Sequence, residues 1–204
     1  MALDGFAAIQ ARIREISGAL PPPAAAPARS LQNTRNAEPV DFASVLAGAA
    51  ESTNGTAAGW SSKAKQFLEI ALVQKGKPYV FASVAKTSDA DPDTFDCSEL
   101  TKWAAARVGV TIPDGASAQY VHARESGTLI PVEQALRTPG ALLFHFGREP
   151  KYMGDRPADG HVAISVGDGV HTIEARGRKY GTNVFELTDS RKKFFNYAAV
   201  VPGM

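Results

Sequence analysis

The stretch FDCSELTKWAAARVG, residues 95–109, joins a cysteine to the start of a helix. Its apolar residues recur every three or four positions, which is typical of a helix with one buried face, and Gly109 ends the pattern. Cys97 therefore lies at the predicted helix start. Unpaired backbone N–H groups and the positive end of the helix dipole stabilise a thiolate there, so the position suits a nucleophile. The same N–H groups can hold an oxyanion.

Cys97 is the only cysteine of the chain, so an internal disulfide is excluded and the thiol is either a packing residue or a reactive group. The 204 residues are 44% apolar and 21% charged, which suits one domain with a sizeable core plus accessory segments. The net charge of +1 disfavours nucleic-acid binding. No run approaches the roughly 18 apolar residues of a membrane span.

Residues 1–59 are predicted to form a tail. Residues 1–20 have apolar positions at helical spacing, residues 21–28 read PPPAAAPA and act as a spacer, and residues 41–50 predict a second short helix. These helices either cover the surface of the main domain or dock to a partner. The beginning of the sequence lacks a secretory signal, so we expect no export by the usual route.

Residues 60–204 are predicted to form one compact domain. Helical patterns come first, at 61–76, 98–109 and 116–125. Strand patterns follow at 141–146, 161–166, 170–175 and 197–202. This order predicts an α+β fold with N-terminal helices packed on a central antiparallel sheet. The GDG turn at 167–169 predicts a hairpin that pairs the strands carrying His161 and Glu174.

A nucleophilic thiolate needs a histidine within hydrogen-bond reach, and His161 is the best placed of the four. It opens a strand after a polar loop, where its side chain can face a cleft while the strand is anchored by apolar neighbours. His122 falls in a predicted helix and His145 in an apolar strand. Histidines at such positions are more often solvated or part of the core.

Glu174 is the candidate third residue, because a carboxylate bonded to the imidazole orients it. It interrupts an apolar strand, where an unpaired buried carboxylate would be costly. His171 is the rival. Alternation along a strand places the two on opposite faces, so only one of them can point at His161. The sequence leaves that choice open, and an exposed strand residue is the ordinary alternative.

Four segments, GKPYVFAS, FDCSEL, PGALLFHFG and GHVAISVGDGVHTIEA, together resemble the NlpC-type family of papain-like cell-wall cysteine endopeptidases. The resemblance covers about residues 62–203. The matching positions, in order, are Gly76, Tyr79, Asp96, Cys97, Ser98 and His161.

This resemblance implies a papain-like fold and hydrolysis of an amide bond in peptidoglycan stem peptides, with no metal or organic cofactor. It makes Cys97, His161 and Glu174 the catalytic set. It also implies that Tyr79, Asp96 and Ser98 line the substrate site. Asp96 is further expected to cap the helix, and a core aromatic is the ordinary alternative for Tyr79.

Four departures from the family pattern concern the site. Glu99 stands where family members usually have Gly, and Phe81-Ala82-Ser83 stands where they have Trp-Gly-Gly. The third residue is often His, Asn or Gln, whereas an acidic one is closer to related amidase-type lysins. The loop at 147–160 is also longer than expected, and we expect its Tyr152 and Arg156 to cover or read the substrate.

The leading hypothesis is a peptidoglycan peptidase or amidase in which Cys97 forms an acyl-enzyme. The alternatives are a non-hydrolytic assembly factor and an acyltransferase or deamidating effector on the same fold. The segments QARIREI and DFASVLAGA loosely resemble the front of flagellar rod-associated wall hydrolases and of secretion- or phage-associated lysins. We therefore expect the tail to engage such an apparatus. The expected location is the periplasm, the cell wall or the exterior by a non-classical route, with cytoplasmic residence left open.

Overall fold

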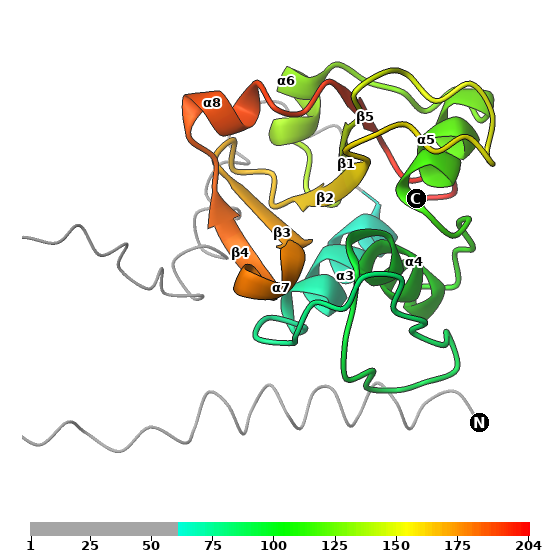
Figure 1. The fold of residues 1–204 in the computed structure, drawn as a ribbon, viewed down its shortest axis with the longest axis vertical. Helices are drawn as coiled ribbons and strands as arrows, with labels where there is room; N and C mark the ends of the chain where they lie inside the picture. The colour runs from blue at the N-terminus through cyan, green and yellow to red at the C-terminus, as the bar shows by residue number, and fades with distance from the viewer. Residues whose placement is uncertain (1–60) are drawn as a thin grey trace, which may run out of the picture. The chain divides into compact units, whose positions relative to one another are not determined.

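The computed structural model describes residues 61–204, so both helices predicted in the tail lie outside the described residues. The described elements are three longer helices, a five-stranded sheet and three short helices (Figure 1). In chain order they are α3 (Ser62–Leu72), α4 (Cys97–Arg107), α5 (Ala116–Glu125), α6 (Val132–Leu136), β1 (Leu142–His145), β2 (His161–Ser165), β3 (His171–Ala175), α7 (Gly177–Tyr180), β4 (Thr182–Glu186), α8 (Asp189–Lys192) and β5 (Tyr197–Ala199).

The strands form one sheet in the order β4-β3-β2-β1-β5, and every neighbouring pair is antiparallel. In the central hairpin Ile164 pairs with Ile173 and Ser165 with Thr172. Glu174 therefore stands one step beyond the Ile164–Ile173 pair, on the same face as His161. The hairpin brings the two residues to neighbouring strands.

Each face of the sheet packs against a different layer. Val162, Ile164 and Ile173 point to the larger core, which also contains buried residues of α3, α4 and α5. Leu143, Ala163 and Ala198 point to a smaller core with α6 and Phe195. Figure 1 shows α3 and α4 on one side of the sheet and α6 and α8 on the other. Because alternate residues face opposite layers, His161 and Glu174 share the face on which α8 lies.

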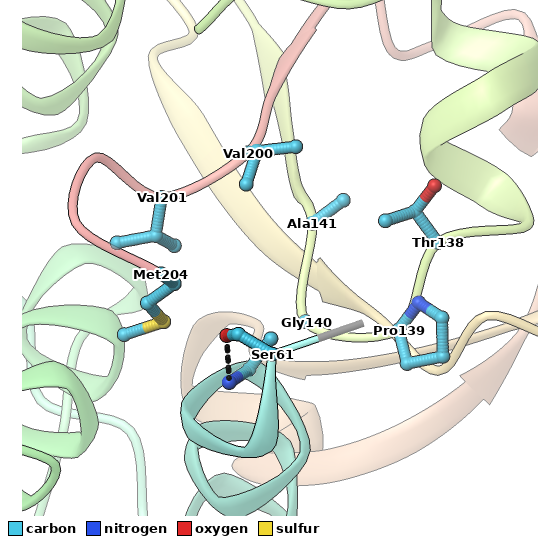
Figure 2. Close-up of a pocket in the computed structure, with 9 residues that line it drawn as sticks. Ser61, Thr138, Pro139, Gly140, Ala141, Val200, Val201 and Met204 are labelled. Carbon is cyan, nitrogen blue, oxygen red and sulfur yellow. Dashed lines mark hydrogen bonds between the residues drawn. The ribbon is translucent and has the colours of Figure 1, made fainter. Parts of the chain in front are cut away.

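The starts of the first two described helices are fixed by local side chains. The Ser61 hydroxyl accepts a hydrogen bond from the N–H of Ala64 at 3.2 Å, which caps α3, and Asp96 caps α4. A hollow of about 190 Å³ lies at the start of α3, lined by Ser61, the Thr138–Ala141 turn, Val200, Val201 and Met204 (Figure 2). None of the candidate site residues lines it.

The α+β architecture with helices first and an antiparallel sheet after them is confirmed. The helices predicted at 61–76, 98–109 and 116–125 correspond to α3, α4 and α5, and the four predicted strands correspond to β1, β2, β3 and β5. Strand β4 and the short helices α6, α7 and α8 were not predicted. Within residues 61–204 no helix combines the length and the apolar character needed to cross a bilayer.

Candidate active site

Cys97 is the first residue of α4 and is partly exposed. Asp96 precedes it, and its Oδ1 accepts hydrogen bonds from the N–H groups of Ser98 at 3.0 Å and Glu99 at 2.8 Å. The N–H of Cys97 itself has no such acceptor within residues 61–204. The cap thus fixes the helix start while leaving one backbone donor free beside the thiol.

His161 and Glu174 are in direct contact. The imidazole Nε2 is hydrogen-bonded to Glu174 Oε2, and the His161 side chain is 15% exposed while the Glu174 side chain is fully buried. A hydrogen bond to Cys97 also acts on His161. Because Nε2 is taken by Glu174, the other ring nitrogen, Nδ1, is the one left for the thiol. The imidazole therefore bridges the cysteine and the carboxylate.

Glu174 has two further donors. Thr172 Oγ1 donates to Oε1 at 2.9 Å, and Arg191 Nη2 donates to Oε2 at 2.9 Å. A buried carboxylate is costly unless its oxygens accept hydrogen bonds, and here both oxygens do. The donors come from β2, β3 and α8, so three elements hold one carboxylate in place.

The charges of this cluster support one another. Burial alone would lower the pKa of His161, but the hydrogen bonds and charges of Cys97 and Glu174 outweigh it and raise the pKa to about 9. Burial alone would raise the pKa of Glu174, but the hydrogen bond from His161 and the charge of Arg191 hold it below its usual value. The arrangement favours an imidazolium paired with a carboxylate.

A cleft of about 690 Å³ opens at Cys97. Tyr79 and Ser98, both expected in the substrate site, line it together with Asp96. Burial, followed by the charges of Cys97 and Asp96, raises the pKa of Tyr79, so its hydroxyl stays protonated as a donor. The Ser98 hydroxyl donates to Asp96 Oδ1 at 3.0 Å and helps to hold the cap.

The remaining histidines have other partners. His171 Nδ1 lies 2.5 Å from Asp168 Oδ2, in the turn before β3. The ring of His145 stacks on Phe194 with centroids 3.7 Å apart. His122 lies in α5 and is half-buried. Of the two rivals for the third position, Glu174 is the one that the structure places beside His161.

Glu99 joins two walls of the cleft. It is buried, its Oε2 accepts the N–H of Ala85 at 3.0 Å, and Lys102 Nζ donates to Oε1 at 2.6 Å. A hydrogen bond also links Glu99 to Asp114. Phe81–Val84 and Asp114–Ser117 both line the cleft. The carboxyl that replaces the usual glycine thus ties both loops to α4.

The loop at 147–160 is braced at several points. Arg148 pairs with Asp155 through contacts of 2.6 and 2.7 Å, and Tyr120 donates its hydroxyl hydrogen to Glu149 at 2.8 Å. Arg156 lines the cleft, whereas Tyr152 is 64% exposed and is not among the lining residues. Of the two loop residues expected to cover or read the substrate, only Arg156 is on the cleft wall.

Arg191 is the neighbour of the site that sequence reasoning missed. It lies in α8, a four-residue helix with too few positions to show a periodic pattern. Its partner Glu174 is 17 residues earlier, and the Arg191 side chain reaches it from α8. A basic residue after a run of strands gives no signal of such a contact.

Within residues 61–204 no group of three or more His, Cys, Asp or Glu could hold a metal ion.

A family model, curated relatives and a solved structure match parts of this chain. The family model described as NlpC/P60 matches residues 76–197, more than half of the chain. The bifunctional muramidase/DL-endopeptidase CwlT of Bacillus subtilis is 34% identical over 100 residues, which cover 48% of this chain and 25% of that protein. The probable endopeptidase p60 of Listeria monocytogenes is 33% identical over 91 residues, which cover 44% of this chain and 18% of that protein.

A solved structure, the P60 domain of an antigen from M. avium subspecies paratuberculosis, matches with a TM-score of 0.51 and 23% identity. The match covers 70% of this chain and 96% of that domain, and it supports the papain-like α+β fold. The matched regions span a quarter or less of the curated relatives, so the comparison concerns one domain of those proteins. With the family model covering the segment from Gly76 through the cleft residues to β5, the chain belongs to the NlpC/P60 family.

Proposed function

We propose that this chain is a peptidoglycan hydrolase that cleaves an amide bond of cell-wall stem peptides through an acyl-enzyme on Cys97. The observation that carries the proposal is the contact of His161 with both Cys97 and Glu174 beside an open cleft. The relatives named as endopeptidases support the substrate class. A thiol, a histidine and a carboxylate in a row are the parts that nucleophilic amide hydrolysis requires.

In the first half-reaction the Cys97 sulfur attacks the carbonyl carbon of the amide, and the oxyanion accepts a hydrogen bond from the free N–H of Cys97. The imidazolium of His161 then gives its proton to the leaving nitrogen, the C–N bond breaks, and a thioester remains. In the second half-reaction His161 removes a proton from water, which attacks the thioester and releases the acid and the thiolate. Glu174 keeps the imidazole oriented in both steps.

Tyr79 and Ser98 are the proposed substrate contacts, since both line the cleft with Cys97. Asp96 contributes through the helix cap, because its Oδ1 accepts three hydrogen bonds from Ser98 and Glu99. The half-buried phenol of Tyr79, whose pKa is raised, offers a neutral donor to the peptide or to the intermediate. The engagement of residues 1–59 with an export or assembly apparatus stays a prediction, and an export assay with and without these residues tests it.

The test is digestion of purified peptidoglycan, with released peptides identified by mass spectrometry. We expect the parent protein to release stem-peptide fragments with one new amine and one new carboxylate. Cys97→Ala and His161→Ala should each lower the rate at least about a thousandfold, since each removes a group used in both steps. His122→Ala is the matched control, because this histidine lies on α5 and should leave the rate unchanged.

Three outcomes separate the hypotheses. A Cys97→Ala protein as active as the parent would rule out the acyl-enzyme. Labelling of Cys97 by an electrophilic probe without any released peptide would favour a binding role. Transfer of the peptide to an added amine in preference to water would indicate an acyltransferase.

A further inference from the structure

Arg191 is a largely buried cation that the proposed chemistry does not use. Its side chain is 14% exposed, and its Nη2 donates to Glu174 Oε2 at 2.9 Å. The guanidinium carbon lies 4.0 Å from the centroid of the Phe194 ring and 5.0 Å from that of Phe195. The two aromatic rings pack against the guanidinium, and the charged group in contact with it is the Glu174 carboxylate.

The burial of Arg191 has a cost that packing alone does not remove. Its Nε is buried without a hydrogen-bond acceptor within the described residues, and burial lowers the pKa of the guanidinium despite the opposing charge of Glu174. If this position served packing alone, an apolar side chain would fill it at a lower cost in folding free energy. The Arg191 charge lies next to Glu174, the carboxylate that contacts His161.

Cys97, His161, Glu174 and Arg191 form a row of alternating charge when the thiolate and imidazolium are present. Glu174 Oε2 is shared between the two cations, so each weakens the hold of the carboxylate on the other. This matters for a histidine that must release its proton to a leaving amine and then take one from water.

We propose that Arg191 is a positioning residue that keeps the Glu174 carboxylate ionised and aimed at His161 while it weakens the grip of that carboxylate on the imidazolium proton. The inference rests on the proposed function, because it assigns a role to His161 as acid and base. Arg191 touches neither the thiol nor the cleft lining.

The groups around the carboxylate are few. Glu174 meets His161 from β2, Thr172 from its own strand, Arg191 from α8 and, by strand pairing, Asn183 of β4. His161 meets Cys97 and Glu174, and the centroid of the Phe194 ring lies 6.3 Å from that of the His161 ring.

Arg176 is a second cation whose charge acts on Arg191, and it lies over the rings of Tyr180 and Phe185. Arg176 has no hydrogen bond to Glu174 and so serves as the control.

The experiment measures the alkylation rate of Cys97 by iodoacetate as a function of pH in the absence of substrate. This anionic reagent reacts fastest while His161 is an imidazolium, so the rate falls as the imidazolium loses its proton. In the parent protein this fall in rate, the alkaline limb of the pH profile, is expected near pH 9. In Arg191→Met the carboxylate no longer shares its charge, so the limb should move to higher pH, by on the order of one unit.

Three further variants complete the test. Arg191→Gln is neutral but can still donate to Glu174, so it should move the limb in the same direction. It replaces Arg191→Met in the test if that variant does not fold. Arg191→Lys and Arg176→Met should leave the limb within a few tenths of a pH unit of the parent.

A limb that stays in place or moves to lower pH in both neutral Arg191 variants would overturn the role of Arg191, and so would an equal shift in Arg176→Met. Neither result would touch the acyl-enzyme proposal, because the parent limb would remain. A parent profile without an alkaline limb near pH 9 would overturn the Cys97–His161 pair, and the role of Arg191 with it. Peptide hydrolysis by the folded neutral variants should show a lower kcat with little change in KM.

Discussion

His161 is stabilised as a cation although it is nearly buried. Hydrogen bonds and charges from Cys97 and Glu174 outweigh the effect of burial and raise its pKa to about 9. Since this value lies above the ordinary value of 6.5, the protonated form contributes stability that is complete below about pH 6.5. That contribution is lost as the pH rises through about 9. In the proposed reaction the same proton is given to the leaving amine, so activity and stability should depend on one titration.

Glu174→Gln is predicted to move the alkaline limb of kcat/KM for peptide hydrolysis to lower pH, by about one unit or more. The amide keeps the shape of the side chain but removes the charge that favours the imidazolium. The measurement is a pH-rate profile on a peptide fragment. Glu186→Gln on β4 is the control, and a limb at the same pH in Glu174→Gln and parent would contradict an electrostatic role for Glu174.

The local sequence was sufficient for some site residues and not for others. Cys97 and His161 stand at a helix start and a strand start, and both positions follow from periodicity in the sequence. The third site residue could be narrowed to Glu174 or His171. Alternation places these two on opposite faces of the strand without saying which face is inward. The contact of Arg191 with Glu174 and that of Glu99 with Ala85 depend on how elements pack, and no sequence period encodes either.

The hairpin of β2 and β3 carries both His161 and Glu174, and its turn is tightly packed. Gly167 has a φ of +90°, and a Cβ there would lie 2.2 Å from Pro139 Cγ. The side chain of any other residue would therefore strain the backbone and push against the segment that leads into β1. The turn predicted from GDG thus also fixes the approach of the hairpin to the preceding segment.

Gly167→Ala is predicted to lower the free energy of unfolding by about 3 kcal/mol or more, as the sum of backbone strain and overpacking. Gly177→Ala is the matched control. Gly177 also has a positive φ, at +66°, but nothing lies within 4 Å of its added Cβ, so strain alone should cost about 1 kcal/mol. Urea unfolding of both variants measures the difference, and equal losses would show that the contact with Pro139 carries no energy.

Elements with a clear period were predictable, whereas strand β4 and the short helices were not. Helices α3, α4 and α5 have ten or eleven residues, enough for the apolar spacing to repeat. Strand β4 lies at the edge of the sheet, where most of its residues are only half-buried and the alternation is weak. Helices α6, α7 and α8 have four or five residues, too few for a period to appear.

At the scale of the whole molecule, Glu99 joins α4 to the two loops that flank the cleft. Burial and the hydrogen bond with Asp114 raise the pKa of Glu99 to about 7, and the charge of Lys102 opposes this. Since the folded value lies above the ordinary value of 4.5, the folded protein binds this proton more tightly than the unfolded chain. The resulting stability is complete below about pH 4.5 and is lost as the pH rises through about 7.

Glu99→Gln is therefore predicted to flatten the fall in unfolding free energy between pH 4.5 and pH 7 that the parent shows. The amide keeps an oxygen for the N–H of Ala85 and a donor for Asp114 and gives up the acceptor of Lys102, so the fold should be retained at some cost in stability. Urea unfolding across this range is the measurement, with Glu69→Gln on the exposed face of α3 as control. The same slope in Glu99→Gln and parent would contradict a shared proton at Glu99.

The division of the site between the helical layer and the sheet has a consequence for the protein during its own synthesis. A ribosome makes Cys97 before it makes His161 and Glu174, which belong to strands encoded later. The growing chain thus contains the proposed nucleophile, Cys97, before the proposed base and carboxylate exist. In the proposed reaction, amide cleavage therefore has to wait until the sheet has formed.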